Sequence, residues 1–150
     1  MTRILTLAAV LMCSAVALAQ TPRQTPAAPN ANAKAFETLQ GTWIVTSFNG
    51  QASDPGVEVA FVVTGEKYHQ TVGDQVPERG GLKIDASKKP MMIDLVITEG
   101  GDAGKTQLGV FEVAGDKLTM KLGVPGETKR PTGLAAEEGF FVMIATKKAK

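Results

Sequence analysis

The chain has 150 residues, and its 16 basic residues nearly balance its 15 acidic residues, for a formal net charge of +1. A nearly neutral chain without a basic run interleaved with aromatics is a poor partner for nucleic acid or for an anionic membrane surface. It has one cysteine and one histidine, which excludes an intrachain disulfide and a metal centre built on several such ligands. No cofactor is expected, and stability must come from a packed core, which this length can supply.

The first segment, residues 1–19, has the pattern of an export signal. Arg3 gives it a positive start, and residues 4–16 are apolar. Ala-Leu-Ala at residues 17–19 matches the small-x-small site of signal peptidase, which predicts cleavage before Gln20. We therefore expect an exported protein, either periplasmic or secreted.

The apolar run of the signal does not predict a membrane anchor. As a helix it would be about 20 Å long, whereas a bilayer core is about 30 Å thick. Cys13 lies in this run, but lipid attachment requires a small residue before the cysteine, and Met12 is large.

The remaining chain divides into a spacer and one domain. Residues 20–33 contain three prolines and no large apolar side chain, which predicts a flexible Pro/Ala-rich spacer. Residues 34–148 are predicted to form a single folded domain.

A period of two, typical of strands, recurs throughout this domain. We predict eight strands, near residues 42–48, 57–64, 68–72, 82–84, 91–98, 105–113, 118–122 and 140–146. The connections, such as Gly80-Gly81, are too short for parallel crossovers, so neighbouring strands should be antiparallel. The predicted fold is all-β: an eight-stranded antiparallel up-and-down barrel, with an open sandwich as the alternative.

Two segments depart from this strand pattern. A helix-prone run, residues 33–40, precedes Gly41-Thr42-Trp43, which holds the only tryptophan. We expect Trp43 to be buried where the first strand begins. The longest connection, residues 123–139, is predicted to be a loop with one helical turn near residues 135–138.

Three patterns that suggest catalysis or ligand binding are better explained as a turn or as residues on solvated strand faces. The segment 100–106 ends in Gly-Lys-Thr, but Glu99 stands where a phosphate-binding loop needs glycine, and a strand pattern follows, so a hairpin turn is predicted. His69 has no Gly-x-Ser-x-Gly partner motif and is expected on a solvated strand face. Acidic residues on different strands leave a catalytic pair open, but their alternation predicts a solvated face; they are Asp85, Asp94 and Glu112.

Several blocks resemble an uncharacterised family of bacterial lipocalin-like domains, of the type common in planctomycetes and often exported. The matching segments are Leu39 to Trp43, Asp85 with Lys88 to Pro90, Ile93 to Leu95, Gly104 to Thr106, Leu108 to Glu112, Gly115 to Leu118, and Pro125-Gly126 with Arg130 to Thr132. The resemblance implies a lipocalin-like barrel in which Arg130 lies across Trp43 and closes one end. It implies no catalytic residue.

An eight-stranded barrel is wide enough to be filled by side chains or to hold one small ligand. The residues expected to face inward are Val45, Val59, Phe61, Tyr68, Leu82, Ile84, Ile93, Leu95, Phe111, Leu118, Met120 and either Phe140 or Phe141. Within this set, five side chains are predicted to contact a ligand: Phe61, Tyr68, Leu95, Phe111 and Met120.

The predicted function is a non-catalytic binding module for a small apolar or amphipathic ligand. Two alternatives stay open: a structural or protein-interaction domain with a filled barrel, and an enzyme that uses carboxylates at the barrel mouth. A cavity with apolar walls and a few convergent polar groups would favour the ligand-binding module. Perturbed carboxylates side by side in a cleft would favour the enzyme.

The export signal gives a direct prediction. Protein recovered from outside the cytoplasm should begin at or near Gln20, because the small-x-small site lies at residues 17–19. N-terminal sequencing of that material checks this, and an exported protein that still carries Met1 would contradict it.

Overall fold

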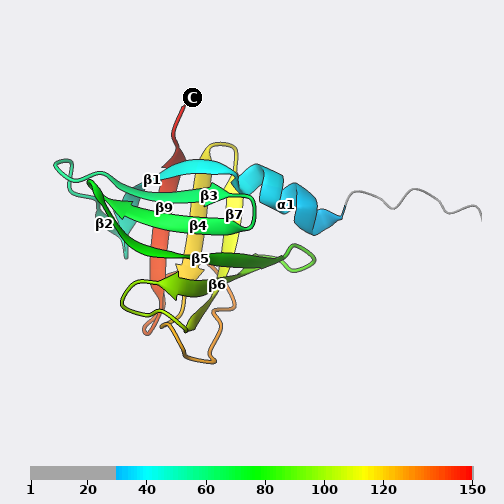
Figure 1. The fold of residues 1–150 in the computed structure, drawn as a ribbon. Helices are drawn as coiled ribbons and strands as arrows, with labels where there is room; N and C mark the ends of the chain where they lie inside the picture. Colours follow the sequence, from blue (N-terminus) through cyan, green and yellow to red (C-terminus); the bar gives the residue numbers. More distant parts are fainter. Residues whose placement is uncertain (1–29, 150) are drawn as a thin grey trace, which may run out of the picture.

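The computed structural model describes residues 30–149. These form one helix and nine strands: α1 (Ala31–Leu39), β1 (Gly41–Phe48), β2 (Gln51–Ala52), β3 (Val59–Thr64), β4 (Lys67–Val72), β5 (Gln75–Asp85), β6 (Met91–Glu99), β7 (Thr106–Ala114), β8 (Lys117–Leu122) and β9 (Phe141–Lys147) (Figure 1). The predicted signal peptide and most of the predicted spacer lie outside the described residues.

The sheet closes into a barrel of eight antiparallel strands. The order is β1-β3-β4-β5-β6-β7-β8-β9, and β9 pairs with β1 to complete the circle (Figure 1). Each strand thus pairs with its neighbour in the chain, apart from β2, a two-residue addition that pairs with the end of β1. The predicted eight-stranded up-and-down barrel is confirmed, and the open sandwich is wrong.

The pairing of β1 changes along its length. Its first half, Gly41 to Ile44, pairs with β3, whereas Ser47 and Phe48 pair with β2. The segment that follows β2 therefore bridges the second half of β1 and the start of β3. A turn in it, with the Val57 amide donating to the Asp54 carbonyl at 3.2 Å, delays the start of β3 to Val59 instead of residue 57.

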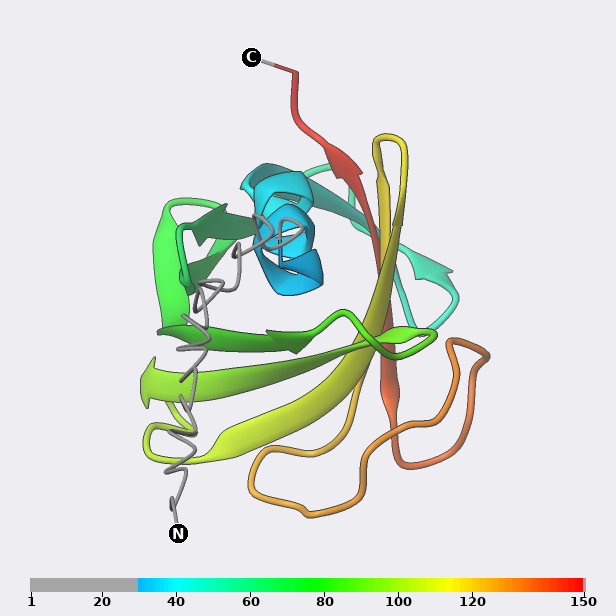
Figure 2. The same cartoon turned by 90° about the vertical axis from the view of Figure 1, so that its right-hand side faces the viewer.

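The helix α1 lies across the barrel end at which β1 begins (Figure 2). Asn30 caps its N-terminus, accepting from the Asn32 amide at 3.1 Å, and the Asn32 side chain accepts from the Ala86 amide at 2.8 Å. Ala35 and Leu39 are buried against the barrel core. The predicted spacer is therefore wrong at residues 31–33, because these contacts make them the first turn of the helix.

Trp43 is completely buried next to the end of this helix. Its indole Nε1 donates to the Leu39 carbonyl at 2.8 Å. The cation over its ring is Lys147, with Nζ 5.0 Å from the centroid, and the same Nζ donates to the Thr38 carbonyl at 3.2 Å. Lys147 occupies this position because it lies opposite Trp43 in the β1–β9 register.

The predicted contact between Arg130 and Trp43 is wrong. Arg130 follows β8 in the long loop, on the outer face of β6 and β7. Its guanidinium donates to the carbonyls of Ile93 and Gly109 at 3.2 and 2.8 Å and to the Asp94 carboxylate at 2.5 Å. Asp94 points outward because it alternates with the buried Ile93 and Leu95, and it holds the arginine outside the barrel.

The long loop contains no helical turn at residues 135–138 within the described structure, contrary to the prediction. Glu137 is instead drawn to Lys121 of β8, whose Nζ lies 2.8 Å from the carboxylate. This Nζ also lies 4.9 Å from the centroid of the Phe140 ring. The loop thereby covers Lys121, whose side chain is only 2% exposed.

The barrel interior matches most of the predicted inward set. A single cluster contains Val45, Phe61, Tyr68, Leu82, Ile84, Ile93, Leu95, Phe111, Leu118 and Met120, with Val59 partly buried against it. The undecided register of β9 is set by its pairing with β8, in which Phe141, Met143 and Ala145 lie opposite Leu122, Met120 and Leu118. Phe141 therefore shares the inner face, and Phe140 packs with the loop.

Replacing Trp43 with alanine should destabilise the protein by roughly 3–5 kcal/mol, because it removes a large buried aromatic side chain. The change also leaves the Leu39 carbonyl without its indole donor. Denaturant unfolding measures the effect. Phe48→Ala is the control, because this aromatic is 48% exposed at the opposite end; an equal loss in both variants would contradict the role given to Trp43.

Candidate functional site

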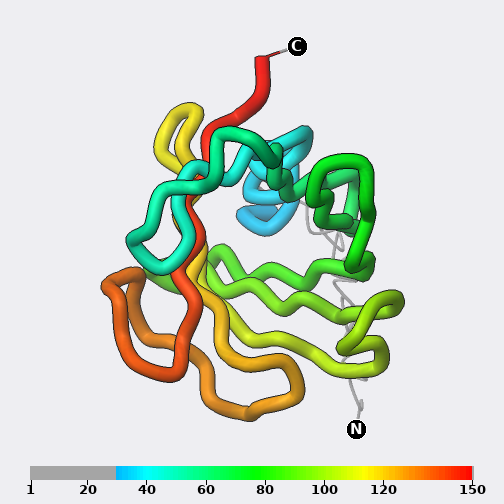
Figure 3. Tube along the Cα trace, turned by 90° about the vertical axis from the view of Figure 1, so that its left-hand side faces the viewer, coloured from blue at the N-terminus to red at the C-terminus, as the bar shows by residue number. Residues whose placement is uncertain are grey.

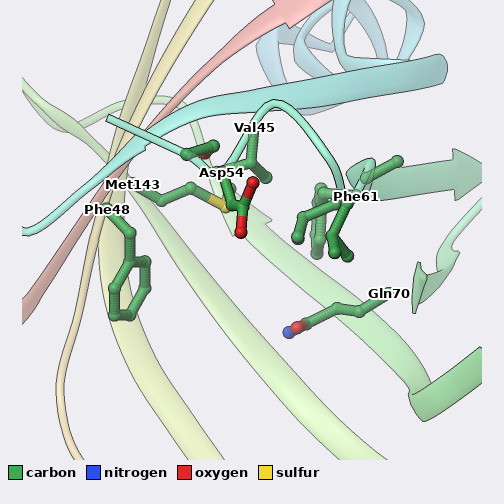
Figure 4. A pocket seen from close by; sticks show the side chains of 10 residues that line it. Val45, Phe48, Asp54, Phe61, Gln70 and Met143 are labelled. Carbon is green, nitrogen blue, oxygen red and sulfur yellow. The ribbon is translucent and has the colours of Figure 1, made fainter. Parts of the chain in front are cut away.

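A pocket of about 380 Å³ lies inside the barrel at the end away from α1. Its residues come from the end of β1, the start of β3, β4, β9 and the segment after β2. They are Val45, Phe48, Ser53, Asp54, Val57, Val59, Ala60, Phe61, Gln70 and Met143 (Figure 4). Figure 3 faces this end of the barrel, where the segment after β1 and the β4–β5 turn lie.

The walls of the pocket are mostly apolar. Val45 and Phe61 are buried at its inner end, and Met143 lies beside them on β9 (Figure 4). At the rim, Phe48 and Val57 are 48% and 41% exposed. The pocket therefore has an apolar floor and an apolar rim that solvent reaches.

Gln70 brings a polar group to this surface. It lies opposite Phe61 on β3 and Glu78 on β5, so all three share the inner face of the sheet. Its Nε2 donates to Glu78 Oε1 at 3.1 Å, and the Tyr68 hydroxyl donates to the same oxygen at 2.8 Å. One carboxylate thus orients two side chains, one lining the pocket and one buried behind it.

Tyr68 is the buried member of this group. Its ring stacks on Phe61, with the centroids 5.3 Å apart, and it lies close over Gly80 of β5. A Cβ at Gly80 would meet the Tyr68 ring at 2.8 Å and the Val96 carbonyl oxygen at 2.2 Å. The predicted turn at Gly80-Gly81 is therefore wrong, because glycine is needed here within β5 for close packing.

Burial raises the pKa of the Tyr68 hydroxyl far above its ordinary value, and the hydrogen bond to Glu78 and its negative charge raise it further. The hydroxyl is consequently a fixed donor at neutral pH and not a proton-transfer group. This side chain is held by Glu78 and does not line the pocket.

The five predicted ligand contacts separate into two groups. Phe61 lines the pocket. Tyr68 lies behind it, and three residues are completely buried in the packed core and do not line this pocket: Leu95, Phe111 and Met120. The pocket lies near β1 and β3 because the end of β1 pairs with β2 instead of β3. The three buried side chains lie on β6, β7 and β8, away from it.

The sequence prediction missed Gln70, Glu78 and Asp54. Gln70 could have been found, since it follows Tyr68 by two residues and must share its face. Glu78 was hidden because the glycines after it suggested a turn instead of a strand. Asp54 belongs to a segment whose position depends on where the β1–β3 pairing ends.

The three carboxylates considered for catalysis lie apart from this pocket. Hydrogen bonds from the Ser87 hydroxyl and amide lower the pKa of Asp85. Asp94 is paired with Arg130, and Glu112 is exposed on β7. Among residues 30–149, no cluster of three or more His, Cys, Asp or Glu side chains could hold a metal ion.

Comparisons of the chain with protein-family models, with curated proteins and with solved structures find no match. The structure itself defines an antiparallel β-barrel with an apolar pocket at the end opposite its helix. Within the described part of the chain, no helix has the length and apolar character needed to cross a bilayer.

The ionisation of Tyr68 can be followed directly, because it is the only tyrosine. The unfolded chain releases this proton near a pH of about 10, whereas the folded state holds it. Stability should therefore fall as the pH rises above that value, and phenolate absorbance should appear together with unfolding.

Absorbance near 295 nm and far-ultraviolet circular dichroism, recorded across an alkaline titration, test this expectation. Glu78→Gln is the informative variant, since it removes the charge that helps raise the Tyr68 pKa but leaves the burial. Its phenolate should appear at lower pH than in the wild type. Ionisation of the wild-type tyrosine in a fully folded barrel would contradict the buried hydrogen bond.

Proposed function

We propose that the protein is an exported, non-catalytic binding module that holds a small apolar or amphipathic ligand in the pocket at the open end of a lipocalin-like barrel. The observation that carries this proposal is the pocket itself. Its volume of about 380 Å³ lies within the usual range of small-molecule sites. Its walls are mostly apolar, with Ser53, Asp54 and Gln70 as polar groups, which is the usual composition of such sites.

The other two functions have less support. A filled interior would favour a purely structural or protein-interaction domain, but the core leaves a pocket of about 380 Å³ beside Phe61 and Met143. Of the carboxylates that would serve an enzyme, Asp85 and Asp94 line one small pocket, but Asp94 is ion-paired there with Arg130. Glu112 is exposed on β7 and does not line that pocket. The pocket supports binding over both.

The pocket also limits the affinity for simple ligands. Burying an eight-carbon chain contributes about 6 kcal/mol, at about 0.8 kcal/mol for each methylene. The loss of translational and rotational freedom costs a similar amount. Since that cost offsets most of the gain, short-chain probes should bind in the millimolar range or more weakly, and a tight natural ligand must present more apolar surface.

Titration with an environment-sensitive apolar dye tests the proposal. The wild type should show saturable binding with one site. Met143→Phe should weaken it by at least about fivefold, which is roughly 1 kcal/mol, because the ring takes up space inside the pocket. Met143 is suitable because it lines the pocket and is only partly buried.

Met91→Phe is the matched control. Met91 is also a partly buried methionine packed against the same core, but it lies on β6 and does not line the pocket. Its dye affinity should stay within error of the wild type. Absence of saturable binding, or an equal effect of both substitutions, would favour the interaction domain instead.

A further inference from the structure

Three polar side chains line the pocket, and hydrogen bonds hold two of them, Asp54 and Gln70, while the Ser53 hydroxyl can donate or accept. Asp54 is the only charged side chain among the described residues that line it. Its Oδ1 accepts a hydrogen bond from the Gly56 amide at 2.8 Å, which fixes the carboxylate. An ionised carboxylate has further lone pairs on both oxygens, so this one retains the capacity to accept from a ligand.

Gln70 is oriented so that it also offers an acceptor. A carboxylate can only accept hydrogen bonds, so the contact with Glu78 fixes the amide nitrogen of Gln70 on that side. The amide oxygen must then face away from Glu78. Figure 4 shows the Gln70 amide and the Asp54 carboxylate pointing toward the space that Phe48, Phe61 and Met143 surround.

The charges around this space are negative. Asp54 lies at the rim, and Glu78 lies directly behind the Gln70 amide. The hydrogen bonds that Glu78 accepts come from two neutral groups, Tyr68 and Gln70. No lysine or arginine is among the described residues that line the pocket.

We infer that the pocket selects amphipathic ligands with a cationic or hydrogen-bond-donating head group, such as a primary alkylamine, and disfavours fatty carboxylates. This rests on the proposed ligand-binding function and names its ligand class. The ammonium donates to Asp54 and to the Gln70 amide oxygen, and the tail lies against Val45, Phe61 and Met143. A carboxylate head would face the Asp54 carboxylate and would find no cation there.

Three probes with the same tail separate head group from tail: octylamine, octanol and octanoate. Each is titrated at neutral pH and low salt into uniformly ¹⁵N-labelled protein, with amide shifts of β1, β3 and β4 as the readout. Octylamine should bind about fivefold more tightly than octanoate, as expected for a partly exposed ion pair, with octanol between them. The difference should shrink as salt is added, because screening acts on the charged contact.

Asp54→Asn identifies the group responsible. It keeps an oxygen for the Gly56 amide but removes the charge, so octylamine and octanoate should bind with nearly equal affinity. The matched control is Glu58→Gln. Glu58 is an exposed carboxylate four positions along the chain that pairs with Lys148 at 3.0 Å and does not line this pocket. This control should keep the preference for octylamine.

The outcomes separate the two proposals. Binding of octanoate as tight as that of octylamine, with shifts in the pocket, would overturn the head-group preference but leave the binding module intact. An equal loss of preference in Asp54→Asn and Glu58→Gln would also overturn it, because the effect would then come from overall surface charge. Failure of all three probes to bind would overturn both proposals.

Discussion

The hydrogen bonding at the C-terminus of α1 is the constraint on which the rest of the barrel depends. The last carbonyls of a helix have no partner within it. Here the Leu39 and Thr38 carbonyls accept from Trp43 and Lys147, which lie opposite each other on β1 and β9. The strand pair that closes the barrel is thus also the pair that caps the helix.

Gln40 extends this arrangement to the neighbouring hairpin. Its side-chain Nε2 donates to the carbonyls of Phe36 and Gly65. Its side-chain Oε1 accepts from the backbone amide of Gly65 at 2.6 Å. Gly65 is in the turn between β3 and β4. The helix, the closing strands and this turn therefore form one bonded unit, which explains why this end of the barrel is filled.

The opposite end has no such unit. Because β1 leaves β3 after Ile44 and pairs with β2, the interior beside Val45 is bordered by a loop instead of a continuous ladder. Phe48 stacks on Phe141 with the ring centroids 5.9 Å apart and keeps β1 and β9 together at the rim. The pocket results from this local change in pairing within an otherwise regular barrel.

Most of the fold could be predicted from the sequence because most of its strands alternate between apolar and polar residues and most of their connections are short. Period two correctly placed buried residues such as Ile93, Leu95 and Phe111, since a strand with one buried face allows only one register. The same pattern wrongly predicted a turn at Gly80, because glycine is common both in turns and where two segments pack closely. Only the ring of Tyr68 distinguishes these, and that ring belongs to another strand.

The position of the pocket was beyond the reach of sequence patterns for a different reason. Alternation shows which side chains point inward, but it does not show how much of the interior they fill. Leu95 and Phe61 have the same inward pattern, yet one is enclosed by the core and the other borders free space. The predicted contact of Arg130 with Trp43 was wrong for a similar reason. Its actual partners depend on the path of a loop, and a loop has no periodic pattern that predicts its path.

The volume of the pocket bears on how a ligand would bind. An empty, sealed cavity of about 380 Å³ would cost about 9 kcal/mol at roughly 24 cal/mol for each Å³, comparable to the whole stability of a small domain. The exposed rim residues Phe48, Val57 and Asp54 show that this space instead opens to water. A ligand would therefore displace water from apolar walls, and the burial of this apolar surface would give a negative change in heat capacity. The filled end supplies the stability, and the open end is free to exchange water for a ligand without disturbing it.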